Sequence, residues 1–206
     1  MKQRGILVVV SGFAGAGKGT LMKNLVGKYD GYALSVSATS RKPRPGEENG
    51  VSYFFKTREE FEAMISADEL VEHAEYVGNY YGTPKKFVDE QLDKGNDVIL
   101  EIEIQGAMQI KKKFPEALLM FVMPPSAEIL KARLVGRGTE TAEVIDKRMK
   151  RAVEESEGIE NYDFIVINDD IDECTEKMHN MIQSSKYTPD RQKSFINMVR
   201  EGLRNL

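Results

Sequence analysis

The segment "SGFAGAGKGT", from Ser11 to Thr20, sets one lysine among glycines directly after the apolar run "ILVVV". Gly12 to Lys18 fit the spacing G-x-x-x-x-G-K, in which glycines let successive backbone N–H groups turn inward. Such a nest at a helix amino terminus binds anions, and the lysine reaches the β- and γ-phosphates of a nucleotide. A flexible glycine-rich turn is the alternative, which the predicted strand before the segment and helix after it disfavour. The sequence therefore predicts a nucleotide phosphate loop.

The residue after the lysine departs from the usual phosphate loop. That position ordinarily supplies a hydroxyl that helps hold Mg²⁺, but here it is Gly19, so the hydroxyl comes from Thr20 or is absent. The sequence "GKGT" resembles the loop of nucleoside monophosphate kinases such as adenylate kinases. A dinucleotide-binding loop fits poorly, because Thr20 stands where G-x-G-x-x-G needs its third glycine. The ATP-binding residues predicted in the loop are Gly12, Ala14, Gly15, Ala16, Gly17, Lys18, Gly19 and Thr20.

A second group of side chains suits a dianionic phosphate. Arg41 and Arg44 lie three residues apart in the proline-containing segment 38–56, and Tyr53 follows them. Guanidinium groups donate bidentate, charge-assisted hydrogen bonds to phosphate, and the prolines stiffen the loop that carries them. A solvated basic loop is the alternative. Taken alone, the segment favours a solvated basic loop. The rest of the chain favours a phosphate-binding site.

Two carboxylates close an apolar segment that predicts a strand from Asn96 to Ile104. On a strand, Glu101 and Glu103 would lie on one face, near the carboxyl end where α/β folds bind ligands. The apolar residues around them indicate a buried strand, in which unpaired carboxylates are costly. We therefore expect ligand roles for both rather than exposed surface positions.

A third group consists of arginines in and beside the segment 134–152. Arg133 and Arg137 are spaced i, i+4 on a predicted helix, and Arg148 lies on the returning helix. Catalysis of phosphoryl transfer depends on positioning and on cations around the transferred group, where one arginine can raise the rate about 10³–10⁵-fold. A solvated, charged helical hairpin is the alternative, and it also describes an open state of this segment.

The elements that position these residues alternate between strand and helix. Ile6–Val10, Ala117–Pro124 and Tyr162–Asn168 are apolar runs typical of strands buried on both faces of a parallel sheet. Helical segments separate them, and the first begins at about Lys18. The alternation predicts an α/β fold with a parallel central sheet flanked by helices.

Local signals mark the ends of several predicted helices. Thr57 with Glu60 forms a capping box, Ser126 is a predicted N-cap and Gly95 a predicted C-cap. In residues 187–206, apolar side chains recur at helical spacing, which predicts a terminal helix that packs onto the body or onto a partner subunit. Those side chains are Phe195, Met198, Val199 and Leu203.

The composition of the whole chain narrows the function classes. Its 206 residues suit one domain, and the net charge of −4 argues against a dedicated nucleic-acid-binding protein. The single cysteine, Cys174, permits no intramolecular disulfide, and no apolar run has the length of a membrane span. The start of the chain lacks the pattern of a signal peptide. We expect a cytoplasmic protein that binds neither nucleic acid nor membrane.

Further motifs make the chain similar to one family. The segment from Ser35 to Phe55 follows the pattern S-V-S-x-T-x-R-x-P-R-x-G-E-x-x-G-x-x-Y-x-F. After it come, in order, "VEHAEYVGNYYGTP", "EIEIQG", "RLVGRGTE", "KRM" and "VINDD". These motifs resemble those of guanylate kinase, and the resemblance extends from about Gly5 to about Tyr187.

The resemblance implies a fold and a reaction. The fold is the P-loop three-layer α/β fold, with a small mixed α/β GMP-binding lobe and a helical lid. The chain is then one domain, 1–206, with a core at about 1–33, 89–133 and 153–206, the lobe at about 34–88 and the lid at about 134–152. The reaction is Mg²⁺-dependent transfer of the ATP γ-phosphoryl group to GMP or dGMP, which gives ADP and GDP in purine nucleotide metabolism. The sequence does not decide between a monomer and a homodimer.

The resemblance also implies residue roles. The GMP phosphate would be held by Arg41, Arg44, Tyr53 and Tyr81, and guanine by Ser37, Glu72, Thr83 and Glu103. The catalytic residues would be Lys18, Arg44, Arg137 and Arg148. Outside the loop, ATP would be contacted by Arg133, Arg137, Asn168 and Asp169. Glu101 and Thr20 are the candidate Mg²⁺ ligands.

The chemistry of guanine agrees with a carboxylate at position 72. Guanine offers N1–H and its 2-amino group as donors, which Glu72 can accept as a pair, while O6 needs a donor such as a hydroxyl. Adenine presents the opposite pattern at these atoms, so a buried carboxylate discriminates strongly against it. A position on a surface helix is the alternative for Glu72.

Two other classes of function compete with this hypothesis. A guanylate-kinase-like interaction module keeps the fold and binds peptides, but such modules typically lose the phosphate loop, which is intact here. Kinases with another acceptor include ribose 1,5-bisphosphate kinase and, more distantly, adenylate and thymidylate kinases. The set formed by Ser37, Glu72 and Thr83 favours guanine.

Overall fold

The central sheet has five strands, all of them parallel. The computed structural model describes residues 3–136 and 141–206. The strand order is β2 (Tyr32–Leu34), β7 (Asp97–Glu101), β1 (Leu7–Gly12), β8 (Leu118–Met123) and β9 (Phe164–Ile167). Val8, Val9 and Val10 at its centre are completely buried, as strands covered on both faces require. The predicted parallel α/β fold is confirmed.

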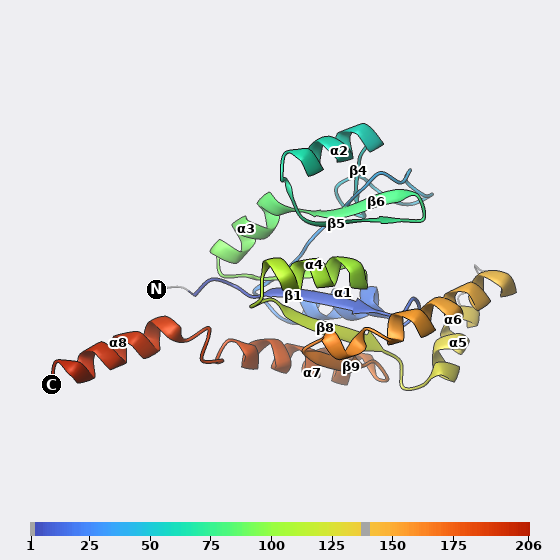
Figure 1. Ribbon diagram of the computed structural model, residues 1–206. Coiled ribbons are helices and arrows are strands. Elements are labelled where there is room, and N and C mark those ends of the chain that lie inside the picture. Colours follow the sequence, from blue (N-terminus) through green and yellow to red (C-terminus); the bar gives the residue numbers. More distant parts are fainter. Residues whose placement is uncertain (1–2, 137–140) are drawn as a thin grey trace.

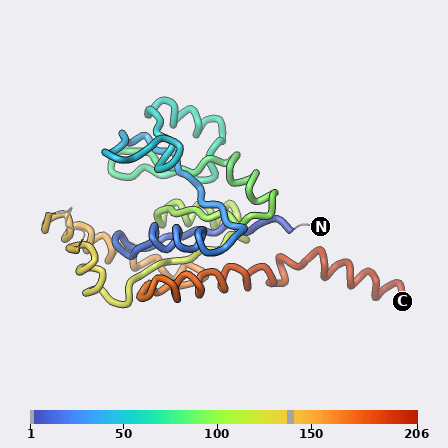
Figure 2. Tube along the Cα trace, turned by 180° about the vertical axis from the view of Figure 1, so that it is seen from behind, coloured from blue at the N-terminus to red at the C-terminus, as the bar shows by residue number. Residues whose placement is uncertain are grey.

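Helices cover both faces of this sheet (Figure 1). Helix α4 (Ile104–Lys113) packs on one face, between the central sheet and the second, smaller sheet. Helices α1 (Lys18–Lys28) and α7 (Ile171–Ser185) pack together on the other face, and the short 3₁₀ turn η1 (Ile159–Asn161) precedes β9. Figure 2 shows the same layers from behind. These layers confirm the three-layer arrangement.

The second sheet belongs to a lobe above α4 (Figure 1). Its strand order is β4 (Phe54–Phe55), β3 (Ala38–Thr39), β6 (Asn79–Pro84) and β5 (Leu70–Tyr76). Helix α2 (Arg58–Ser66) covers it and begins with the predicted capping box. The lobe has its own small core of Ala38, Phe61 and Leu70. Helix α3 (Lys85–Asp93) leads from the lobe back to β7. Its C-cap is Lys94, one residue before the predicted Gly95, whose N–H donates to the carbonyl of Leu92 at 2.9 Å.

Two helices form the arm that lies beside the carboxyl ends of the strands (Figure 1). Helix α5 (Ala127–Gly136) is capped by Ser126, whose Oγ lies 3.3 Å from the N of Ile129, and α6 (Ala142–Ser156) is capped by Thr141. The predicted lid falls on this arm. Arg137 lies outside the described residues.

The predicted strand from Asn96 to Ile104 is wrong at its carboxyl end. Strand β7 ends at Glu101, where its register with β1 stops, and Glu103 is the N-cap residue of α4. Ile104 therefore opens a helix whose buried residues, Ala107 among them, pack beneath the lobe. The two carboxylates do not share a strand face: Glu101 closes the strand, and Glu103 stands at the helix amino terminus.

The terminal helix α8 (Lys193–Arg204) leads away from the body (Figures 1 and 2). Within the described part of the chain, α8 buries none of its side chains, and Phe195, Met198 and Leu203 are 59%, 59% and 66% exposed. Packing of this helix onto the body, one of two expectations, is therefore wrong. As far as the chain is described, no helix combines the length and apolar character needed to cross a bilayer.

Candidate active site

The phosphate loop joins β1 to α1 as the sequence predicts. Gly15 and Gly17 have φ angles of 93° and 90°, which glycine adopts without steric cost and other residues rarely adopt. The N–H of Ala16 donates to the carbonyl of Phe13 across the turn, at 3.0 Å, and α1 begins at Lys18. The loop therefore presents the amino terminus of a helix, which favours an anion.

Lys18 lies over the loop, where its Nζ donates to the carbonyl of Gly12 at 2.6 Å and to that of Phe13 at 3.3 Å. Behind the loop, the amide of Asn168 donates to the carbonyl of Ala16 at 2.8 Å, and Arg133 donates to the carbonyl of Asn168 at 2.9 Å. Asn168 is only 5% exposed. Here Asn168 and Arg133 support the loop backbone, a function that sequence reasoning did not assign to them because it depends on contacts between distant segments.

Glu101 lies beside the first turn of α1. A Cβ atom placed on Gly19 would be 3.9 Å from its Oε2, so the missing side chain leaves room between this carboxylate and the loop. Partial removal from water raises the pKa of Glu101, the charge of Lys18 opposes that shift, and Glu103 adds to it. Thr20 is exposed on the same turn. A cation near Glu101 would relieve this cost.

The donor set around Glu101 fits Mg²⁺ that arrives with phosphates. Among residues 3–136 and 141–206, no three His, Cys, Asp or Glu side chains are grouped to hold a metal ion by themselves. Mg²⁺ usually takes one or two protein oxygens and completes its shell with water and substrate phosphate. Glu101 and Thr20 beside the loop match this requirement.

The predicted acceptor-phosphate residues lie together in the lobe. Arg41 forms a bidentate pair with Glu47, at 2.8 and 3.0 Å, and its guanidinium carbon lies 5.4 Å from the ring centroid of Tyr53. The ring centroids of Tyr53 and Tyr81 are 6.1 Å apart. Glu47 also accepts from the N–H of Arg44 at 2.7 Å, so it orders the arginine loop. Sequence reasoning missed Glu47, although its spacing of three from Arg44 was a usable signal.

The Tyr53 phenol is half-buried within this group of side chains. Burial raises its pKa, Tyr81 acts in the same direction, Arg41 opposes the rise, and Glu101 adds to it.

Glu72 and Thr83 form the buried centre of the lobe's ligand side. Glu72 lies on strand β5, which excludes the surface-helix alternative, and it is 3% exposed. The hydroxyl of Thr83 donates to Glu72 Oε1 at 2.7 Å. Burial raises the pKa of Glu72 to about 7, and the Thr83 hydrogen bond and the charge of Lys113 oppose that rise.

The first turn of α4 approaches the Glu72 carboxylate closely. A Cβ atom on Gly106 would lie 2.6 Å from Glu72 Oε2, so a larger residue there would displace the carboxylate. Glu103, the N-cap of the same helix, is one turn away. Sequence reasoning placed Glu72 and Glu103 at one site and missed Gly106, because nothing in its neighbours indicates this approach.

Of the remaining predicted residues, the structure describes Ser37, Arg148 and Asp169. Ser37 precedes β3, and its carbonyl accepts from the N–H of Phe54 at 2.9 Å. Arg148 lies half-buried on α6, and Asp169 is exposed after β9. The structure does not describe Arg137, so its predicted role stays a prediction.

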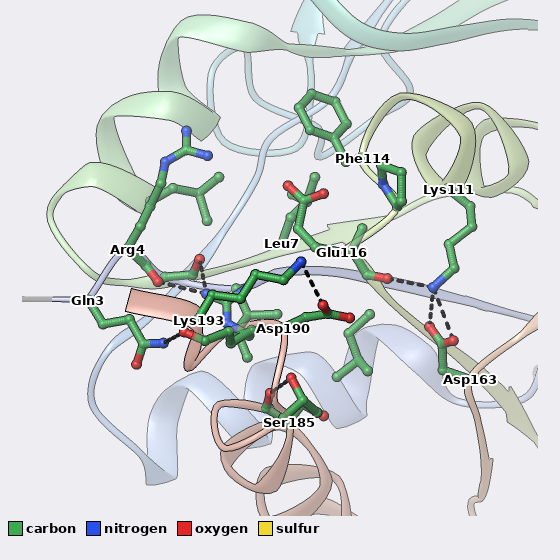
Figure 3. Close-up of a pocket in the computed structure, with 18 of the residues that line it drawn as sticks. Gln3, Arg4, Leu7, Lys111, Phe114, Glu116, Asp163, Ser185, Asp190 and Lys193 are labelled. Carbon is green, nitrogen blue, oxygen red and sulfur yellow. Dashed lines mark hydrogen bonds and ion pairs between the residues drawn. The ribbon is translucent and has the colours of Figure 1, made fainter. Parts of the chain in front are cut away.

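A cavity of about 840 Å³ lies at the opposite end of the central sheet (Figure 3). Its lining includes Leu7 at the start of β1, Phe114 at the end of α4, and Asp190 and Lys193 at the base of α8. Asp190 and Lys193 pair at 2.8 Å. The cavity contains none of the residues predicted to bind nucleotide.

Known proteins are similar to this chain in sequence and in architecture. The guanylate kinase family model matches residues 4–185. A guanylate kinase of Caldanaerobacter subterraneus subsp. tengcongensis is 49% identical over 98% of both chains, and one of Halalkalibacterium halodurans is 50% identical over 92% of this chain and 93% of its own. The crystal structure of guanylate kinase from Anaplasma phagocytophilum superposes with a TM-score of 0.76 at 34% identity, over 92% of this chain and 90% of that one. The phosphate loop, the arginine pocket and the buried carboxylate thus occur in a chain that belongs to the guanylate kinase family.

Proposed function

We propose that the protein transfers the γ-phosphoryl group of ATP to GMP, and less efficiently to dGMP, with Mg²⁺. The observation that carries this proposal is the Glu72 carboxylate, 3% exposed and hydrogen-bonded to Thr83, in the lobe that faces the phosphate loop. A buried carboxylate is costly unless a ligand supplies donors to it. The N1–H and 2-amino groups of guanine are such donors.

The proposed reaction uses residues of the phosphate loop together with residues of the lobe. The loop and Lys18 hold the β- and γ-phosphates of ATP, while Arg41 and Arg44 hold the acceptor phosphate in line with them. An oxygen of the GMP phosphate forms the new bond to the γ-phosphorus as the bond to the β-phosphate oxygen of ADP breaks. Bound Mg²⁺, next to Glu101 and Thr20, would neutralise charge on the phosphates. Arg148 and Arg137 are proposed to add positive charge from the lid.

The competing functions predict different acceptors or none. An interaction module needs no phosphate loop, yet Lys18, Gly15 and Gly17 keep the geometry of one. Adenine and the pyrimidines lack the paired donors of guanine, so a kinase for their nucleotides would leave a buried carboxylate without partners. Ribose 1,5-bisphosphate would leave the Glu72 pocket without donors.

An acceptor panel tests the proposal. With ATP and Mg²⁺, we expect GMP to give the highest rate of ADP release, dGMP a lower one, and AMP, CMP, UMP and ribose 1,5-bisphosphate rates at least about 10²-fold lower. A coupled assay of ADP release measures all six. A higher rate with AMP or with ribose 1,5-bisphosphate would overturn the assignment of the guanine pocket, and no turnover with any acceptor would favour a binding module.

We further propose that the protein is a homodimer in which the apolar faces of two α8 helices pack antiparallel. Phe195, Met198 and Leu203 share one face of this helix and are more than half exposed. In an antiparallel pair, the carboxyl end of one helix lies beside the base of the other, where the cavity of Figure 3 opens.

The length of α8 sets the size of such a contact. A 12-residue helix is about 18 Å long, and two such faces would form the centre of an interface, for which stable complexes typically bury about 1,600 Å² in total. Light scattering after gel filtration should give about twice the 23.2 kDa of one chain. Met198→Glu should give monomers, whereas Asn197→Glu on the polar face should not. A monomeric wild-type protein at micromolar concentration would contradict the proposal.

A further inference from the structure

Arg151 joins three elements around the proposed guanine site. It lies on α6 of the lid arm, and its guanidinium carbon is 4.2 Å from the ring centroid of Tyr76, at the end of β5. Its Nε donates to Glu155 Oε1 at 2.7 Å, and its Nη2 lies 3.6 Å from Glu103 Oε2. One side chain thus connects the lid, the lobe and the amino terminus of α4.

The three contacts use different parts of the guanidinium group. Its central carbon lies over the Tyr76 ring, while two of its nitrogens meet the two carboxylates. A planar, delocalised cation can do both at once, whereas an ammonium group cannot. Burial and the neighbouring Glu103 raise the pKa of Glu155, and Arg151, which contacts both carboxylates, lowers it.

Guanine has one donor more than Glu72 can accept. Its N1–H and one hydrogen of the 2-amino group can pair with a single carboxylate, which leaves the second amino hydrogen. Glu103 is placed to accept it, because Glu72 Oε2 lies against Gly106, one helical turn after Glu103. The Glu103 side chain is 55% exposed, so without a partner it would sample several rotamers and lose entropy on binding.

We propose that Arg151 is a positioning residue that holds Glu103 toward the 2-amino group of guanine. The proposal rests on the proposed function, since it concerns how the same site recognises GMP. It assigns to Arg151 part of the preference for guanine over hypoxanthine, which has N1–H and O6 but no 2-amino group. IMP therefore binds without either contact of the 2-amino group, the one to Glu72 and the one to Glu103 that Arg151 supports, so loss of Arg151 should not change its affinity.

The experiment compares Arg151→Met with a matched control, Arg58→Met. Arg58, on α2 of the lobe, has a comparable set of contacts: its guanidinium carbon lies 4.3 Å from the Tyr80 ring centroid, and it pairs with Glu62 and Glu75 at 3.1 and 3.6 Å. Calorimetry gives Kd for GMP and IMP, and steady-state kinetics give kcat and KM for GMP and ATP. Thermal unfolding shows whether each variant folds.

Arg151→Met should raise Kd and KM for GMP about 5–10-fold, with Kd for IMP and KM for ATP unchanged and kcat at saturating GMP within about twofold. Arg58→Met should leave the GMP-to-IMP ratio of Kd as it is in the wild type. The Kd for GMP of Arg151→Lys should lie nearer to that of Arg151→Met than to that of the wild type. Equal shifts for GMP and IMP, or no shift, would overturn the proposal.

A double-mutant cycle with Glu103→Ala isolates the positioning effect. Once Glu103 is absent, Arg151→Met should cause no further loss of GMP affinity; additive losses would overturn the proposal. If Arg151→Met fails to fold, Glu103→Ala alone must reduce the GMP-to-IMP preference, and an unchanged preference overturns the proposal equally. Wild-type protein that does not phosphorylate GMP refutes the proposed function instead, whereas active wild type with an unchanged ratio in Arg151→Met refutes this inference alone.

Discussion

Lys18→Ala should lower kcat about 10²–10³-fold and leave the Kd for GMP within about twofold of the wild type. The ammonium group lies 2.6 Å from the carbonyl of Gly12, at the mouth of the anion nest, where it can reach the phosphates of ATP. Charge that develops on the transferred group is stabilised by such fixed donors, and removal of one typically costs this factor. In the proposed function GMP binds in the lobe, through Arg41 and Glu72, so its affinity should not depend on Lys18.

Lys23→Ala is the matched control for this variant, because Lys23 is an exposed lysine on the same helix. Its removal should leave both kcat and Kd unchanged. Turnover is measured at saturating ATP and GMP by ADP release, and GMP binding by calorimetry without ATP. A Lys18→Ala variant that retains the wild-type kcat would show that the loop binds nucleotide without contributing to the reaction.

The sequence predicts most elements of the fold because their signals are local. Ile6–Val10 is a run of apolar, mostly β-branched residues and forms the central strand, and the Thr57 cap starts α2 as expected. The failure at Glu103 has a tertiary cause: "EIEI" alternates like a strand, but pairing with β1 ends at Glu101 and α4 begins under the lobe. The spacing in α8 predicts a helix and does not identify what covers its apolar face.

The residues of the candidate site likewise fall into two groups: those visible as sequence motifs and those that only the fold brings together. The loop around Lys18 and the arginine pair Arg41 and Arg44 are visible as motifs, because the residues that act together are neighbours in sequence. Partners from distant segments are not visible as motifs. Asn168 donates to a carbonyl 152 residues earlier, and Arg151 on α6 meets Glu103 at the start of α4. The resemblance to a family supplied Glu72 as a base-binding residue, while only the structure shows that it is buried on a strand.

Glu72→Gln should lower kcat/KM for GMP about 10²-fold while KM for ATP stays within about twofold. The amide keeps one acceptor but places a donor against the N1–H and 2-amino groups of guanine, and an unmatched buried donor is costly. The substitution also removes the charge that strengthens both hydrogen bonds. Equal losses for GMP and ATP in steady-state kinetics would argue against recognition of the base.

The raised pKa of Glu72 makes the same pocket depend on pH. With a pKa of about 7 in the free protein, the group is mostly protonated at pH 6, and a protonated carboxyl no longer accepts two donors. The affinity for GMP should therefore rise from pH 6 to pH 8 by more in the wild type than in Glu72→Gln, where the titration of the GMP phosphate remains as a common background. Calorimetry across this range measures both. Parallel profiles would contradict ionisation of Glu72 in this window.

Stability should change in the opposite direction to affinity. The folded pKa lies above the usual 4.5, so the contribution of Glu72 to stability is full below pH 4.5 and is lost as pH rises through 7. At pH 8 the ionised group costs roughly 3 kcal/mol relative to its neutral form, and Glu72→Gln should unfold at a higher denaturant concentration than the wild type.

Gly106→Ala separates the charge of Glu72 from its position. The added Cβ displaces the carboxylate, so GMP affinity should fall about tenfold while the pH dependence of stability remains. A variant at Gly106 that binds GMP normally would show that the close approach of α4 does not hold Glu72 in place.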